Sequence, residues 1–83
     1  MNLQEAREVI NKETSDELRV VWLIEDIVNL EGKLISFYGA QIIYCGVRIK
    51  SFPVECELED LTNDILSDII GIKSRGIDSY LGR

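Results

Sequence analysis

Residues 18–28, LRVVWLIEDIV, decide what this chain can fold into, because two structures fit them. As a strand, they alternate between two faces, and the β-branched residues that favour strands are abundant. As a helix, Val20, Leu23 and Ile27 fall on one apolar stripe. The five consecutive apolar residues 20–24 suit a strand that is covered on both faces better than they suit a surface helix. We therefore expect a strand, with the helix as the alternative.

Two further strands are expected after this segment, over residues 33–38 and 41–52. Gly39 and Ala40 lie between them, and a glycine in the first central position suits a two-residue hairpin turn. Pro53 is expected to end the second of these strands, because it has no N–H to donate to a neighbouring strand.

Helices are expected at the two ends of the chain. Residues 3–12 carry apolar side chains on one face, and Asn2 is placed to cap this helix. Residues 58–70 have the strongest helical pattern, with apolar residues three and four apart, and Gly71 is expected to end the helix. The tail beyond it is too rich in glycine for another long helix.

These elements predict one α+β domain over residues 1–83. It has an N-terminal helix, a three-stranded antiparallel meander and a long amphipathic C-terminal helix. If residues 18–28 are helical instead, the fold becomes a hairpin with three helices. A chain of 83 residues builds one core and has little room for an enclosed cleft.

Charge and composition remove several classes of function. Fifteen acidic residues against nine basic ones give a net charge of −6, which opposes attraction to a phosphate backbone, so we expect no direct contact with nucleic acid. The chain has no histidine, and therefore lacks the commonest general base and zinc ligand. The longest uncharged run, residues 34–47, is too short to cross a bilayer, so no membrane contact is expected.

The N-terminus and the cysteines suggest a compartment. The first residues show neither the basic nor the apolar region of a targeting signal, which predicts a cytoplasmic protein. Cys45 and Cys56 are expected to be reduced thiols, with a disulfide between them as the alternative. Cys45 is expected on the core face of its strand, where its thiol would be inert.

The first candidate site is a row of acidic residues on the C-terminal helix, which we call the acidic ridge: Glu57, Asp60, Asp64 and Asp68. Spacings of three and four residues place these side chains along one face of a helix. The ridge is expected to be either a solvated surface or a contact for a basic protein. We expect no metal there, since carboxylates on one exposed face lack the enclosing ligands that calcium and magnesium need.

A second candidate surface combines two tyrosines with two basic residues on the predicted hairpin: Tyr38, Tyr44, Arg48 and Lys50. Tyrosine and arginine are enriched in protein interfaces. Trp22 is expected at the centre of the core, because a small core needs its large apolar area. No catalytic residue and no cofactor site are expected.

Together these patterns predict a small, acidic, non-enzymatic protein that binds another protein with a basic surface. Inhibitors, immunity proteins and anti-defence factors have this character. One alternative is an oligomer that binds an anionic, nucleotide-like ligand between its copies, using the second candidate surface. Another is a structural or assembly subunit, and homo-oligomers are expected for both alternatives.

Overall fold

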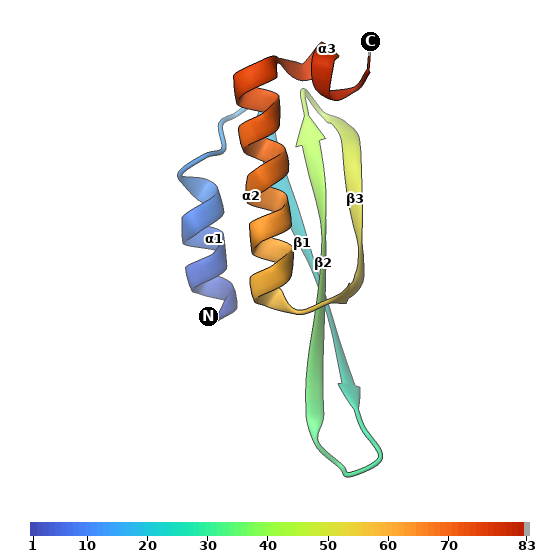
Figure 1. Ribbon diagram of the computed structural model, residues 1–83. Coiled ribbons are helices and arrows are strands. Elements are labelled where there is room, and N and C mark those ends of the chain that lie inside the picture. The colour runs from blue at the N-terminus through green and yellow to red at the C-terminus, as the bar shows by residue number, and fades with distance from the viewer. Residues whose placement is uncertain (83) are drawn as a thin grey trace.

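The computed structural model describes residues 1–82 and contains three strands and three helices (Figure 1). In chain order these are α1 (Leu3–Asn11), β1 (Leu18–Val28), β2 (Leu34–Tyr44), β3 (Val47–Cys56), α2 (Leu58–Arg75) and α3 (Ile77–Tyr80). The strands form one antiparallel sheet in the order β1-β2-β3. Helices α1 and α2 lie side by side on one face of this sheet (Figure 1). The predicted α+β fold, with its helix, three-stranded meander and C-terminal helix, is confirmed.

Strand β1 confirms the strand prediction for residues 18–28. It pairs with β2 without interruption, from Leu18 opposite Tyr44 to Val28 opposite Leu34. Trp22 was expected at the centre of the core, and this is wrong: it is half-buried and packs against the core from one side. The reason is that β1 is an edge strand, so the centre of the core lies over β2 instead.

The turn between the second and third strands is not at Gly39-Ala40, as the sequence predicted, but at Cys45-Gly46. Both turn residues have positive φ, 49° for Cys45 and 81° for Gly46. This is the geometry of a type I′ turn, whose twist matches that of the flanking strands. Tyr44 and Val47 are therefore directly opposite each other at the end of the hairpin.

Gly39 lies inside β2, where β3 comes close to it. A Cβ atom at this position would lie 2.7 Å from the carbonyl oxygen of Phe52 and 2.9 Å from the backbone nitrogen of Val54. The pairing of β2 with β3 also shifts register beside Gly39, between Tyr38 and Ala40. Pro53 does not end β3 as predicted, because an edge strand can carry a proline where its N–H would have no partner.

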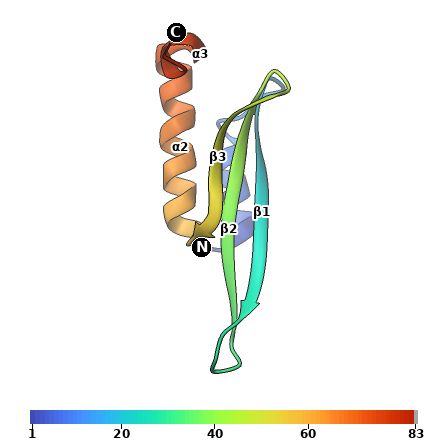
Figure 2. The same ribbon diagram turned by 90° about the vertical axis from the view of Figure 1, so that its right-hand side faces the viewer.

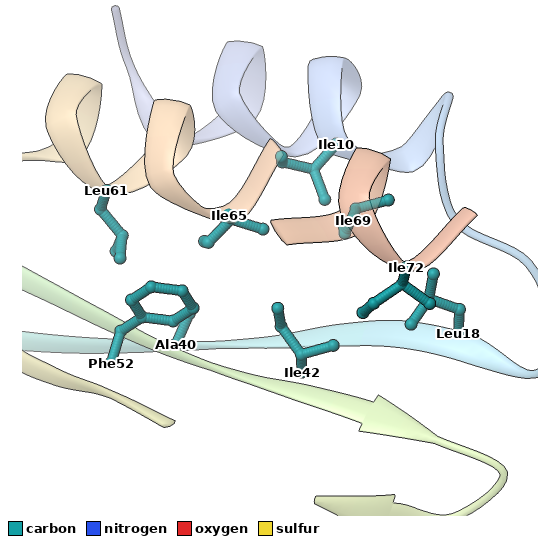
Figure 3. Packing of buried hydrophobic residues seen from close by; sticks show 9 residues of the cluster. All are labelled: Ile10, Leu18, Ala40, Ile42, Phe52, Leu61, Ile65, Ile69 and Ile72. Atoms are coloured by element: carbon teal, nitrogen blue, oxygen red, sulfur yellow. The ribbon is translucent and has the colours of Figure 1, made fainter. Parts of the chain in front are cut away.

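The core is formed between the two long helices and one face of the sheet, which we call the inner face (Figure 3). Its buried cluster consists of Ile10, Leu18, Ala40, Ile42, Phe52, Leu61, Ile65, Ile69 and Ile72. Helix α2 contributes four of these residues at spacings of three and four, which is the stripe that its sequence predicted.

Helix α1 begins where the sequence predicted, whereas helix α2 ends later than the sequence predicted. Asn2 caps α1, and its side-chain oxygen accepts a hydrogen bond of 2.8 Å from the backbone N–H of Glu5. Helix α2 does not end at Gly71 but continues to Arg75. The following turn, α3, packs Ile77 and Tyr80 against the core.

The molecule is elongated, with extents of 47 × 23 × 19 Å. Its radius of gyration is 14.0 Å, against about 12 Å for a compact domain of this length. The β1–β2 hairpin causes the difference, because it projects well beyond the ends of both long helices (Figures 1 and 2). Within residues 1–82, none of the helices is both long and apolar enough to cross a membrane.

Candidate functional site

The acidic ridge is only partly the open surface that its spacing predicted. Glu57, which precedes α2, is exposed, and so are Asp60 and Asp64. Asp68 is half-buried, because α3 folds back beside it and the Tyr80 hydroxyl donates a hydrogen bond of 3.4 Å to its Oδ2 atom. Three carboxylates of the ridge therefore remain free for a partner, while the fourth helps to hold α3.

The contact between Tyr80 and Asp68 predicts a loss of stability in alkaline solution. Burial raises the pKa of Tyr80 above its usual 10.0, and the charge of Asp68 and the hydrogen bond to it act in the same direction. Above pH 10 the unfolded chain loses this proton before the folded one does, so folding stability falls as the pH rises. We expect a shallower fall in Tyr80→Phe, measured as the urea midpoint across this pH range. An equally steep fall in the variant would contradict this assignment.

The second candidate surface is not one surface. Tyr38 and Tyr44 pack against the core from the inner face. Arg48 pairs with Ile43 on the opposite side of the sheet, and the Lys50 ammonium lies 5.5 Å from the centre of the Phe52 ring. The sequence placed all four together because it put the turn at the wrong position, which altered how the two strands alternate.

A shallow hollow lies between the Cys45-Gly46 turn and α3. Its volume is about 290 Å³, and it is lined by Tyr44, Cys45, Val47, Ile49, Ile77, Asp78 and Leu81. The charged side chain in this lining is Asp78, which would repel an anionic ligand. The hollow therefore does not favour the alternative of a nucleotide-like ligand.

The two cysteines are free thiols. Cys45 lies exposed in the turn, so its expected place on the core face is wrong. Cys56 lies at the far end of β3, about 30 Å of extended strand away. This separation is far beyond the reach of a disulfide, so Cys45 and Cys56 cannot form a bond within one chain.

The largest candidate surface is the side of the sheet that faces away from the helices, which we call the outer face (Figure 2). Because side chains alternate along a strand, the neighbours of the inner-face residues point to this side. Six of them are large and apolar: Val21, Leu23, Ile27, Ile35, Phe37 and Ile43. Val21 is 46% exposed and Ile27 43%, and among residues 1–82 no helix covers them. A large apolar patch of this kind usually marks an interface.

Charged residues lie around this apolar patch. Arg19 and Arg48 are at the same level of the sheet, because both pair with Ile43 of β2. Glu25 lies on β1 further toward the hairpin tip, opposite Phe37. The outer face thus has an apolar centre with basic residues at one end and an acidic residue nearer the other.

The projecting end of the β1–β2 hairpin, residues 24–36, extends this surface, and we call it the arm. It is apolar on both of its faces: Leu34 is 67% exposed on the inner side, and Ile35 is 38% exposed on the outer side. An isolated two-stranded ribbon is marginally stable in water and gains most from packing against something else. The arm is therefore a second indication that the single chain lacks a partner surface that would cover its apolar side chains.

Hydrogen bonds keep the arm ordered. The side-chain oxygen of Asn29 accepts hydrogen bonds from the backbone N–H groups of Glu31 and Lys33, at 3.0 and 2.9 Å. Across the ribbon, the Ser36 hydroxyl donates a hydrogen bond of 2.6 Å to Asp26. An arm that is ordered before binding loses less conformational entropy when a partner covers it.

Comparison of the chain with protein-family models, with curated proteins and with solved structures finds no match. The outer face must therefore be interpreted from its own chemistry. Sequence reasoning did not name it as a site, although the pattern was present: the apolar run 20–24 indicated a strand covered on both faces. The structure covers only one face.

Proposed function

We propose that this chain is a non-enzymatic protein-binding module whose main contact surface is the outer face of its sheet, continued onto the arm. One observation carries the proposal: β1 is apolar on both sides, and within residues 1–82 the helices cover only the inner one. A sheet face of this composition is normally packed against another layer of structure.

The acidic ridge is a second contact in this proposal. Asp60 and Asp64 lie on α2 and Glu57 directly precedes it, on the helical side of the molecule, so all three stay accessible when the outer face is covered. Their charge would raise the rate of encounter with a basic protein surface, and contribute less to the affinity itself. An inhibitor or immunity factor of the cytoplasm fits this arrangement, and two free cysteines, one exposed and one half-buried, agree with that compartment.

A surface variant tests the proposal. Val21→Lys places a charge within the apolar patch of the outer face, at a side chain that the core does not need. Proteins that co-purify with a tagged copy from its own host should be lost from this variant. Asn11→Lys is the matched control, since it adds the same charge at an exposed position at the end of α1, away from both the outer face and the acidic ridge, and should keep every partner. Equal capture by wild type, Val21→Lys and Asn11→Lys would overturn the proposal.

A further inference from the structure

We propose that the protein that covers the outer face is a second copy of this chain, in a twofold dimer with the two sheets packed face to face. This inference rests on the proposed function, because it names the partner of the same surface. The helices of both copies would lie on the outside, giving four layers in the order helix, sheet, sheet, helix. Both acidic ridges would then face solvent on opposite sides of the dimer.

A second copy would cover the exposed outer face of both molecules at once. Each chain carries an apolar outer face without a cover, and a twofold axis buries both faces in a single closed contact. Sheets pack in this way about 10 Å apart, with their side chains interdigitating. No other sequence is needed to complete the fold of either copy.

The exposed area agrees with a missing contact of this size. A folded monomer of 9.5 kDa typically exposes about 5,000 Å², whereas this chain exposes 5637 Å². The excess of about 600 Å² is close to the roughly 800 Å² that each partner buries in a standard interface. Part of this excess lies on the outer face, where Val21 is 46% exposed, and part lies on the arm, whose tip is left uncovered by a dimer centred on Trp22.

Charge decides the relative direction of the two sheets. If the strands ran parallel, with β1 over β3 of the partner, Arg19 would face Arg48 of the other copy, because both lie at the level of Ile43. If they run antiparallel, with β1 over β1 of the partner, Arg19 can face Glu25. Opposite charges at the rim favour the antiparallel arrangement and disfavour the parallel one.

The antiparallel arrangement also matches apolar residues with each other. An axis at the level of Trp22 that places Arg19 over Glu25 of the partner places Val21 over Leu23. On the central strand, the same axis places Phe37 over Ile43. One twofold axis therefore pairs charge with charge at the rim and apolar with apolar inside, as in known interfaces.

Pairing through a sheet edge explains the surface less well. The β3 edge carries Pro53 and two register shifts, features that block the addition of a strand. On β1, pairing about a twofold axis within the arm would bring the neighbouring Glu25 and Asp26 close to their own copies. Pairing centred on Trp22 would bring the two α1 helices together, because α1 lies on the β1 side of the inner face (Figure 1).

The first test is the mass of the full chain in solution, by sedimentation equilibrium from about 1 to 100 µM, the range in which a micromolar dissociation constant is measured. We expect about 19 kDa, twice the mass of one chain, at the upper end of the range. Phe37→Gln is expected to give the monomer mass, with a circular dichroism spectrum like that of wild type. Phe37 lies on the central strand, so a dimer that survives this change would be an edge contact and would overturn the inference.

The second test exchanges the rim charges. Arg19→Glu and Glu25→Arg should each weaken self-association by about tenfold, since two opposite-charge pairs become like-charge pairs in each dimer. An equimolar mixture of the two variants should recover the dimer, because every rim pair is then Glu with Arg. Weakening without recovery in the mixture would overturn the proposed orientation.

Failure of the dimer and failure of the proposed function give different results. If wild type stays monomeric over the whole range while Val21→Lys loses its captured partners, the second copy is wrong and the outer face binds another protein. If Val21→Lys changes neither the mass nor the captured partners, the outer face is not a contact surface and both proposals are overturned.

Discussion

Gly39→Ala is expected to destabilise the protein by about 3 kcal/mol, because overpacking costs most where the neighbouring atoms cannot move. The new Cβ would lie 2.7 Å from the Phe52 carbonyl oxygen and 2.9 Å from the Val54 nitrogen. Both are backbone atoms of β3, so no side-chain rotation relieves the contact. Relief would require β3 to move away from β2, which would also shift the buried Phe52 ring. A domain of this size is stable by about 4–12 kcal/mol, so the loss is a large fraction of the total.

Urea unfolding measures this effect, and Gly32→Ala is the control. Gly32 lies at the tip of the arm with a φ of 80°, and a Cβ there would meet nothing within 4 Å. Its substitution costs only the strain of the left-handed conformation, about 1–2 kcal/mol. A smaller loss at Gly39 than at Gly32 would show that the close approach of β3 is not what requires glycine.

The same glycine shows what could and could not be predicted of the fold. The periodicity of residues 58–70 was sufficient to predict a helix, whereas residues 18–28 fitted both periods and the apolar run 20–24 favoured the strand. Gly39 was interpreted as a turn because glycine favours turns, yet its cause is a contact with residues thirteen and more positions away. A close approach between strands that are distant in the sequence leaves no local sequence pattern. The true turn needs a positive φ at two residues, and Cys45 and Gly46 both adopt it.

The candidate sites also divide into one that the sequence could predict and others that it could not. The acidic ridge could be predicted because helical spacing fixes which side chains share a face, and Asp68 departed from it only because α3 folds back onto α2. The prediction of the second candidate surface was wrong because one misplaced turn changes which residues of β2 and β3 lie on the same side of the sheet. The outer face was implicit in the apolar run of β1. It became a site only when the structure showed that both helices lie on the inner face.

The packing of α2 on the sheet predicts the other large effect. Ile65→Ala should destabilise the fold by about 2–5 kcal/mol, because it removes a fully buried side chain and leaves a cavity between α2 and the sheet. Ile65 lies among Ile10, Ile42 and Ile69, which come from both helices and from β2 (Figure 3). The cavity is therefore enclosed on several sides and cannot close by the movement of one element.

Ile70→Ala is the matched control on the same helix, since Ile70 is 51% exposed and faces away from the core. Both variants replace isoleucine by alanine, so the change in helix propensity is nearly the same at the two positions. At the exposed position 70 the substitution should cost less than about 1 kcal/mol. Both variants are compared by their urea midpoints at pH 7. Similar losses at the two positions would mean that α2 is turned about its axis relative to the sheet. Its stripe of Leu61, Ile65 and Ile69 would then not be what buries the inner face, and the side of the sheet left open would have to be assigned again.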